Sequence, residues 1–389
     1  MSWGGVRLVV TGFRGGRSRF LLVGATAALA SCVPDSRPSA AQSQPSAPPP
    51  QAIVSIPIPP PKPRAVRAAP DRLADAVEAA LRGFEGRAGA AVRAVDDGWT
   101  VEAGGRQRLP QQSVSKLWVA LTLLDQRDQG RVRLDDPITI RRQDLTLFHQ
   151  PIAYIVAKNG SFTTTVGDLL TRALTQSDNT ANDRLLTLVG GPDAVRDTIA
   201  NKRLGEIRFG PGERLLQSGT AGLTWRPEYS LGNAFSVARS RLDPALRRAA
   251  LDTYVSDPPD GASPLAIADA LSRLARGELL SESSTRLMLE TMGRTVTGRA
   301  RLRAAARPGW EVAHKTGTGQ DLGGRNAGFN DVGLLTAPDG RRYAVAVMIG
   351  DTTRPIRERQ MLIQAVARAV ALYGPGSPGA IADAGVAAN

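Results

Sequence analysis

Apolar residues recur at intervals of three and four positions in two segments, 71–86 and 355–373, and this spacing places them on one face of an α-helix. They are Leu73, Val77, Leu81 and Phe84 in the first segment and Leu362, Val366 and Val370 in the second. Shorter apolar stretches bounded by turn residues predict strands at 90–95, 100–103, 310–315, 331–336 and 343–349. The section between the early and late strands, about 113–300, has mostly the spacing of helices.

Two early strands, three late strands and a long helical section between them predict an α+β fold. The early pair forms a hairpin across Asp97-Gly98, and Pro338-Asp339-Gly340 joins the last two strands. We expect one antiparallel sheet of about five strands, built from both chain ends and flanked by helices, together with an inserted all-helical lobe. The cleft between sheet and lobe is then the expected place for an active site.

The first 31 residues have the pattern of a bacterial signal peptide of the lipoprotein type. Three arginines precede an apolar run over 20–30, which is too short to span a bilayer. The run ends in Leu29-Ala30-Ser31-Cys32, which resembles a lipobox, and Cys32 is the only cysteine of the chain. We therefore expect Cys32 to become lipidated and to hold the exported protein on a membrane. The alternative is an ordinary signal peptide with an incidental cysteine.

Composition divides the rest of the chain into three parts. Residues 32–70 are rich in Pro, Ser and Ala and predict a tether, 71–373 predict the folded domain, and 374–389 predict a flexible tail. Because Val33 rather than an aspartate follows Cys32, we expect a lipoprotein at the periplasmic face of the outer membrane. Without lipidation we expect a protein soluble in the periplasm. The sequence assigns no role to the long region 190–262.

The chain is basic, with a net charge of +13, but the charge is not arranged for nucleic acid. Basic residues form no stripe interleaved with aromatic side chains, so we expect a solvated basic surface and no nucleic-acid partner. The single cysteine excludes an internal disulfide, and two histidines with one cysteine argue against a Cys/His metal site. We expect neither a metal nor a cofactor. The sequence does not determine the oligomeric state, for which a monomer is our expectation.

Lysine is rare in this chain, in which five lysines stand against 44 arginines. Arginine serves wherever a plain positive charge is needed, whereas lysine can lose its proton when it is buried. A lysine retained in such a chain is therefore a candidate for proton transfer. Two of the five, Lys116 and Lys315, fall in short motifs that also contain serine or threonine.

Three short motifs follow one another along the chain. Ser113 and Lys116 lie three positions apart at the start of an apolar run, so a helix would place them on one face, where a buried lysine can take the serine's proton. Ser177-Asp178-Asn179 follows a predicted helix, and Lys315-Thr316-Gly317-Thr318 ends a predicted strand. Each motif alone is also typical of a helix cap, a turn or a chance tripeptide. Together, in this order and in these settings, they resemble the motif trio of penicillin-recognising serine hydrolases.

Over residues 71–373 the chain resembles the class A β-lactamase family. The resemblance extends beyond the three motifs to Leu134-Asp135-Asp136-Pro137-Ile138-Thr139-Ile140, Asp144-Leu145, Thr180-Ala181-Asn182, Gly190-Gly191-Pro192, Thr297-Gly298 with Arg301, and Asn330-Asp331. It implies a serine hydrolase that opens the amide bond of β-lactams through an acyl-enzyme intermediate. The expected substrates are β-lactams or peptides of the D-Ala-D-Ala type.

The resemblance also implies a role for each motif residue. Ser113 is acylated, Lys116 helps to deprotonate it, and Ser177 relays a proton to the leaving nitrogen. The backbone N–H groups of Ser113 and Thr318 form the oxyanion hole. The residues expected to contact the substrate are Asn179, the cleft-lining Phe148 and, at the substrate carboxylate, Lys315, Thr316, Thr318 and Arg301.

One position departs from the family pattern. Members of the family hydrolyse the acyl-enzyme with a Glu that follows a Trp in a loop past the second motif, whereas Arg226 follows Trp225 in this chain. A guanidinium is no base. Either the base is missing and deacylation is slow, or Glu228 or Glu213 takes its place. A missing base favours a penicillin-binding D-Ala-D-Ala carboxypeptidase or endopeptidase, and a lipoprotein that only binds the cell envelope is a third, weaker alternative.

Overall fold

The computed structural model describes residues 68–374. The expected signal peptide, Cys32, nearly all of the tether and the tail from 375 onward lie outside the described residues, so these remain predictions. Within 68–374, no helix combines the length and the apolar character that crossing a bilayer requires.

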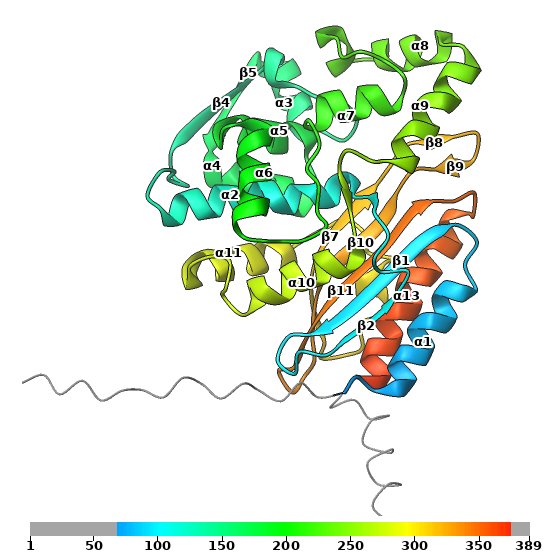
Figure 1. Ribbon diagram of the computed structural model, residues 1–389. Coiled ribbons are helices and arrows are strands. Elements are labelled where there is room, and N and C mark those ends of the chain that lie inside the picture. The colour runs from blue at the N-terminus through cyan, green and yellow to red at the C-terminus, as the bar shows by residue number, and fades with distance from the viewer. Residues whose placement is uncertain (1–67, 375–389) are drawn as a thin grey trace, which may run out of the picture. The chain divides into compact units, whose positions relative to one another are not determined.

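One antiparallel sheet of five strands, in the order β2-β1-β11-β10-β7, is the frame of the fold (Figure 1). Its strands are β1 (Arg87–Ala94), β2 (Thr100–Ala103), β7 (Glu311–Thr318), β10 (Phe329–Thr336) and β11 (Arg342–Asp351). The early hairpin pairs with the last strand, with Val92 opposite Val345, so both ends of the folded domain meet in one sheet. The structure thus confirms the predicted α+β class and the origin of the sheet.

The central strand β11 is buried on both faces because helices cover the sheet from two sides. Val345 and Val347 point into one hydrophobic cluster, and Ala344 and Ala346, which alternate with them, point into the other. The helices on the first face are α1 (Asp71–Arg82) and α13 (Ile356–Tyr373), which lie side by side in Figure 1. Both were predicted from their apolar spacing, although α1 ends four residues before the predicted boundary.

Helix α2 (Lys116–Asp128) is the centre of the helical lobe, and all but three of its 13 residues are buried. An apolar helix of this kind needs neighbours on every side. The other helices of the lobe and of the second face of the sheet are α3 (Pro151–Asn159), α4 (Val166–Thr171), α5 (Asn179–Leu188), α6 (Gly191–Asn201), α10 (Pro264–Ala275) and α11 (Glu282–Gly293). Of these, α5, α6 and α11 contact α2, and α10 packs on the sheet.

The lobe also contains a short hairpin, so it is not all-helical as predicted. Its strands are β4 (Pro137–Arg141) and β5 (Ser161–Thr165). Ile138 and Ile140 point inward and alternate with polar residues, which is the strand period that the sequence interpretation overlooked.

The region 190–262 folds into a helical layer at the edge of the lobe. After α6 it contains α7 (Glu213–Thr220), the 3₁₀ turn η4 (Pro227–Ser230), α8 (Ala234–Arg241) and α9 (Pro244–Ser256). Its end, β6 (Gly261–Ala262), pairs with β3 (Leu109–Pro110) directly before the first motif. The remaining elements are β8 (Asp321–Leu322) and β9 (Arg325–Asn326), which lie beside α9 in Figure 1, and α12 (Leu302–Ala305).

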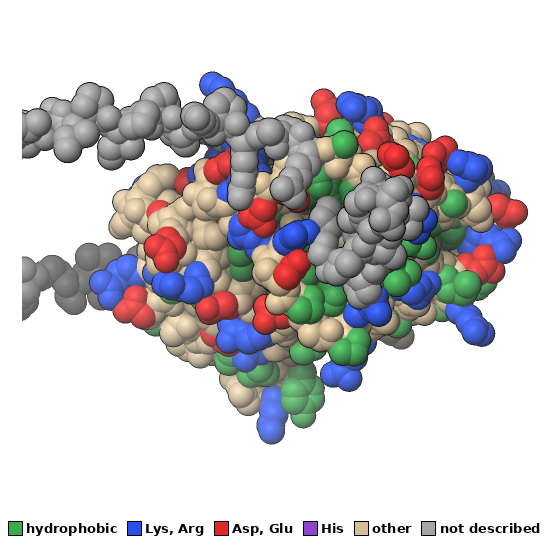
Figure 2. All heavy atoms as spheres, turned by 90° about the horizontal axis from the view of Figure 1, so that it is seen from below, with side chains coloured by type: hydrophobic (Ala, Val, Ile, Leu, Met, Phe, Trp, Pro, Cys, Tyr) green, Lys and Arg blue, Asp and Glu red, His purple; other side chains and the backbone are tan. Residues whose placement is uncertain are grey.

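Charged side chains of both signs are interspersed over the face of the protein drawn in Figure 2. Exposed ion pairs also occur along single helices, as between Arg82 and Glu78 of α1, whose nearest N and O atoms are 2.8 Å apart. Exposed pairs of this kind contribute little to stability. The fold is therefore stabilised mainly by the two large apolar clusters, one on each face of the sheet.

Truncation of the cluster between the sheet and α13 should destabilise the fold. Ile363 is fully buried on α13, so Ile363→Ala removes apolar contacts and leaves a cavity. We expect the free energy of unfolding, measured by urea denaturation, to fall by about 2–5 kcal/mol. The matched control is Met361→Ala on the same helix, because Met361 is 52% exposed and its truncation should change the free energy by about 0.5 kcal/mol or less. Equal effects of the two variants would contradict this account of the core.

Candidate active site

The first motif forms a tight turn that leads into the buried helix. Ser113 lies in a 3₁₀ turn over Gln112–Ser115, and Lys116 is the first residue of α2. The Lys116 ammonium is 1% exposed and donates a hydrogen bond to the Ser113 hydroxyl, with 2.8 Å between Nζ and Oγ. The structure thus brings these two predicted residues into direct hydrogen-bond contact.

The turn begins with a strained residue that the long helical region holds in place. Gln112 has a φ of +54°, which is unusual for a residue with a side chain. Its backbone N–H donates to the Asp260 carboxylate at 2.8 Å, and its side-chain amide donates to the Tyr254 hydroxyl at 2.6 Å. Two residues near the end of the region 190–262 therefore fix the backbone that presents Ser113.

The second motif is both a helix cap and part of the site. Asp178 caps α5 by accepting a hydrogen bond from the Ala181 N–H at 2.9 Å. Ser177, just before it, adopts the left-handed conformation, with a φ of +61°. Its hydroxyl accepts a hydrogen bond of 2.9 Å from the Lys315 ammonium of β7. The Asn179 amide donates to the Leu147 carbonyl at 2.8 Å, which fixes the orientation of its side chain.

The third motif lies on β7, the edge strand of the sheet. It requires a glycine for a reason that the sequence analysis did not identify. A Cβ atom at Gly317 would lie 2.3 Å from the Gln111 carbonyl oxygen, so only glycine lets β7 approach the nucleophile turn. Arg301 supports the same strand, because its guanidinium donates to the Gly317 carbonyl at 3.0 Å and to the Thr318 hydroxyl at 2.6 Å. Burial lowers the pKa of Arg301 to about 10.

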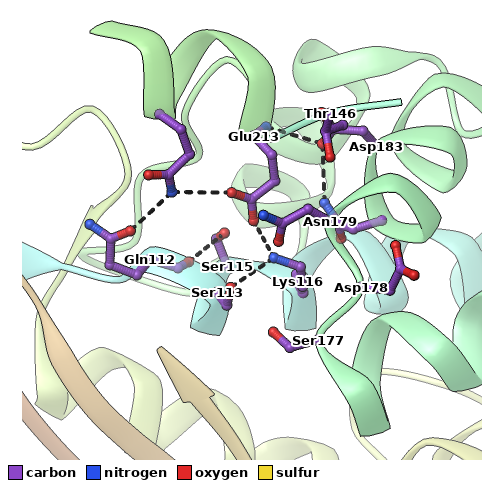
Figure 3. Close-up of polar contacts among 12 residues, drawn as sticks. Gln112, Ser113, Ser115, Lys116, Thr146, Ser177, Asp178, Asn179, Asp183 and Glu213 are labelled. Atoms are coloured by element: carbon purple, nitrogen blue, oxygen red, sulfur yellow. Dashed lines mark hydrogen bonds and ion pairs between the residues drawn. The ribbon is translucent and has the colours of Figure 1, made fainter. Parts of the chain in front are cut away.

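The two lysines of the site have different electrostatic surroundings. Lys315 is fully buried, and burial together with the charge of Lys116 holds its pKa well below the ordinary value. Lys116 instead contacts a carboxylate, that of Glu213 at the start of α7. Figure 3 shows the Lys116 ammonium between the Ser113 hydroxyl and the Glu213 carboxylate. Each serine of the site is thus hydrogen-bonded to a buried lysine, and one of these lysines also has a buried counter-ion.

The structure separates the two carboxylates that the sequence offered as candidates for the base. Arg226 and Glu228 have side chains that are 65% and 54% exposed, and they pair with each other at 2.8 Å. Neither contacts the motif residues. Glu213, 4% exposed, is the candidate whose carboxylate contacts Lys116. The sequence analysis did not consider Gln217, which lies one helical turn after Glu213 and could have distinguished it from Glu228. The Gln217 amide donates to the Glu213 carboxylate at 3.2 Å.

Asp183 fixes the start of the helix that carries Glu213. One of its carboxylate oxygens accepts the Glu213 N–H at 3.0 Å, and the other accepts the Arg214 N–H at 3.3 Å. Burial, with a smaller contribution from the charge of Glu213, raises the pKa of Asp183 to about 6. Asp183 follows the second motif closely on α5, but its function depends on a helix thirty positions away, and the sequence analysis did not identify it.

Several residues of the three motifs line a cleft of about 520 Å³ between the lobe and the end of β7. Its walls include Ser113, Ser177, Asn179, Thr316 and Thr318. The predicted Phe148 lies at its rim, 49% exposed, with its ring edge-on to Phe235 of α8 at 5.2 Å between centroids. Among residues 68–374, no three His, Cys, Asp or Glu side chains are grouped so that they could hold a metal ion.

The site combines two serine–lysine pairs with an adjacent carboxylate. These groups lie at a cleft beside an antiparallel sheet. This arrangement is that of a serine acyl-hydrolase. The chain belongs to the β-lactamase enzyme family, which its residues 72–373 match. This confirms the class A resemblance seen in the motifs.

Individual relatives agree with this assignment. The extended-spectrum β-lactamase PER-1 of Pseudomonas aeruginosa is 28% identical over 296 residues, covering 76% of this chain and 85% of that protein. The β-lactamase VEB-1 of Pseudomonas aeruginosa is 26% identical over 302 residues, covering 77% and 89%. The crystal structure of a β-lactamase from Chitinophaga pinensis superposes with a TM-score of 0.63 at 28% identity, covering 76% of this chain and 97% of that one.

The buried Asp183 should make stability depend on pH. Its folded pKa of about 6 exceeds the ordinary value of 3.8, so its ionisation destabilises the folded state as pH rises through this interval, and the cost is complete above pH 6. This difference corresponds to about 3 kcal/mol. Relative to Asp183→Asn, the wild type should therefore lose about 3 kcal/mol of unfolding free energy between pH 4 and pH 7, as measured by denaturation at each pH.

The control for this prediction is Asp197→Asn on α6, which changes an exposed aspartate. Its unfolding free energy should follow that of the wild type across the same pH range. A difference between wild type and Asp183→Asn that stays constant with pH would contradict the raised pKa.

Proposed function

We propose that this protein hydrolyses the amide bond of β-lactams, with Ser113 as the nucleophile and Glu213 as the base that releases the acyl group. The observation that carries the proposal is the contact of Lys116 with both the Ser113 hydroxyl and the Glu213 carboxylate. A hydroxyl, an amine and a carboxylate in direct succession form a path along which the serine's proton can leave.

In the acylation step, the Ser113 oxygen attacks the carbonyl carbon while its proton passes to Lys116, which gives one of its own protons to Glu213 at the same time. The backbone N–H groups of Ser113 and Thr318 stabilise the oxyanion. The Ser177 hydroxyl gives its proton to the leaving nitrogen, and Lys315, which donates to Ser177 at 2.9 Å, supplies a proton in turn. The low pKa of Lys315 favours this transfer, because a buried ammonium gives up its proton readily.

Substrate binding is assigned to the residues at the end of β7 and on the lobe. Thr316, Thr318 and Arg301 bind the substrate carboxylate, in an environment whose positive charge Lys315 augments. The Asn179 amide lines the cleft and hydrogen-bonds the amide group of the substrate's acyl side chain. Phe148, exposed at the rim, provides an apolar contact.

Before deacylation, Glu213 releases to solvent water the proton that it received during acylation, and Lys315 takes up a proton in place of the one it gave. Glu213 then deprotonates a water molecule that attacks the ester of Ser113. The Gln217 amide, 3.2 Å from the Glu213 carboxylate, orients this carboxylate and leaves its other oxygen to Lys116. Slow deacylation was expected only because Arg226 was placed at the position of the base. With Glu213 in that role, the chain has the groups that both half-reactions require, and the expectation of a D-Ala-D-Ala peptidase loses its premise.

Removal of the base should separate the two half-reactions. In Glu213→Gln, Lys116 still contacts the Ser113 hydroxyl and can itself take the proton, so acylation is slowed less than deacylation, for which no base remains. Steady-state hydrolysis of benzylpenicillin should therefore fall about 10²–10⁴-fold. Intact-mass spectrometry should then show an accumulated penicilloyl adduct, and peptide mapping should place it on the peptide that contains Ser113. Formation of the adduct also demonstrates that the variant is folded.

The control for this experiment is Glu228→Gln, which changes the exposed carboxylate next to Arg226 and should hydrolyse benzylpenicillin at the wild-type rate. Rapid turnover by Glu213→Gln would refute its role as base. An adduct on Ser115 or Ser177 would refute Ser113 as nucleophile. A wild type that is acylated by benzylpenicillin but never released would favour the peptidase.

We also propose that Cys32 is lipidated and anchors the protein at the periplasmic face of the outer membrane. The support is Leu29-Ala30-Ser31-Cys32 at the end of an apolar run, followed by the Pro-rich segment that leads to the folded domain. In a bacterial host, Cys32→Ser should move the protein from the membrane fraction to the soluble fraction or leave its signal peptide uncleaved, as seen by fractionation and immunoblotting. Wild-type protein found fully processed in the soluble fraction would indicate an ordinary signal peptide instead.

A further inference from the structure

The helical layer formed after Glu213 reaches the rim of the active-site cleft. Tyr229 of η4 and Phe235 of α8 pack with Leu147 in a small apolar cluster, and the Phe235 ring also contacts Phe148 at the rim. Helix α8 is therefore anchored beside the cleft by aromatic contacts, and side chains on its inner face become part of the cleft wall.

One of these side chains is Arg239, which is half-buried and lines the same cleft as Ser113 and Asn179. Its guanidinium donates to the Gln320 side-chain oxygen at 3.0 Å. The Gln320 amide in turn donates to the Gln217 carbonyl at 2.8 Å and to the Gln217 side-chain oxygen at 3.1 Å. Because Gln217 contacts Glu213, a chain of side chains links Arg239 to the part of the cleft where the base acts on the acyl group.

The charge of Arg239 is not neutralised by a neighbouring carboxylate. In the part of the chain that the structure describes, no Asp or Glu oxygen lies within ion-pair distance of its guanidinium, whose hydrogen-bond partner is a neutral amide. Asp321 is the one acidic residue among those lining the cleft, and its carboxylate lies 3.6 Å from Arg359. Burial lowers the pKa of Arg239, and the positive charge of Arg247 on α9 lowers it further. A guanidinium nevertheless keeps its proton in proteins.

Arg301, the other arginine of the cleft, is engaged differently. It is 8% exposed, and its guanidinium donates to Thr318 and to two backbone carbonyls, those of Gly317 and Asn330. It supports the strand whose hydroxyls receive the substrate carboxylate. Arg239 comes from a different element, and its bond to Gln320 uses only one of five N–H donors. The cleft therefore contains a second cationic position with donors available to a ligand.

We propose that Arg239 is a specificity-determining residue that binds a carboxylate on the acyl side chain of the substrate. This inference rests on the proposed function, because it assigns the acyl side chain of a β-lactam to the part of the cleft between Asn179 and Gln320. A guanidinium and a carboxylate form paired, charge-assisted hydrogen bonds, which neutral Gln320 cannot supply. The preferred substrates are then β-lactams that carry two anionic groups, one on the ring system and one on the acyl side chain.

The test compares benzylpenicillin with carbenicillin, which differs from it by one carboxylate on the acyl side chain. In Arg239→Gln, kcat/KM for carbenicillin should fall about tenfold or more, mainly through a higher KM, because one charge-assisted contact is lost. The value for benzylpenicillin should change by about twofold or less. Arg239→Lys keeps the charge without the paired geometry and should retain part of the preference. The matched control is Arg241→Gln, an exposed arginine on the same helix, which should leave both substrates unaffected.

Salt provides a second measurement on the unmodified protein. Raising the ionic strength screens a charge contact in an open cleft, so it should reduce the carbenicillin preference of the wild type and have little effect on that of Arg239→Gln. Equal losses for both penicillins in Arg239→Gln would indicate that the residue only holds α8 in place, and would overturn the inference. An unchanged substrate ratio would overturn it as well. Failure of the wild type to hydrolyse benzylpenicillin would refute the proposed function itself and is a distinct result.

Discussion

The buried ammonium group of Lys116 is the constraint on which the rest of the site depends. Lys116 is 1% exposed, so its charge is stabilised by an opposite charge beside it, and removal of one partner of such a pair typically costs about 3–5 kcal/mol. Glu213 provides that charge from α7 and thereby joins the helical layer to the nucleophile turn. Two further buried carboxylates reinforce the connection, since Asp183 holds the start of α7 and Asp260 holds Gln112. The geometry around Ser113 is therefore maintained by interactions between segments that are distant in sequence.

The site contains two serine–lysine pairs, Ser113 with Lys116 and Ser177 with Lys315. The two pairs consist of the same chemical groups but are assigned different functions. Lys116 has a carboxylate beside it, whereas Lys315 is buried near another ammonium, and its pKa is lowered as a result. A lysine with a low pKa exchanges protons easily, and one that is paired with a carboxylate can pass a proton on. The difference comes from the surrounding charges rather than from the residue types, because both lysines contact a serine hydroxyl at nearly the same distance, 2.8 and 2.9 Å.

Much of this architecture could be predicted from the sequence because it depends on local patterns. The strands and terminal helices follow from apolar spacing, and the motif residues were identified because their order and settings are characteristic. The hairpin β4–β5 was overlooked, although Ile138 and Ile140 alternate with polar residues as strands require. Glu213 could only be offered as one of several candidates, because its position depends on how the region 190–262 folds back onto α2. Trp225 was misleading, because a tryptophan before a charged residue does not by itself determine whether the following side chains reach the cleft. Arg226 and Glu228 after it are exposed and pair with each other.

The segment that begins at Glu213 and ends at Asp260 is continuous, and it carries the proposed base at one end, the anchor of Gln112 at the other and Arg239 between them. Substitutions that reshape α8 to admit a different side chain will therefore strain the helix that positions the base. We therefore expect changes of substrate breadth through this segment to change turnover as well. Evolution toward a new antibiotic through this segment should proceed by compensated pairs of changes, and Phe148 is tied to the same segment because its ring packs against Phe235 of α8.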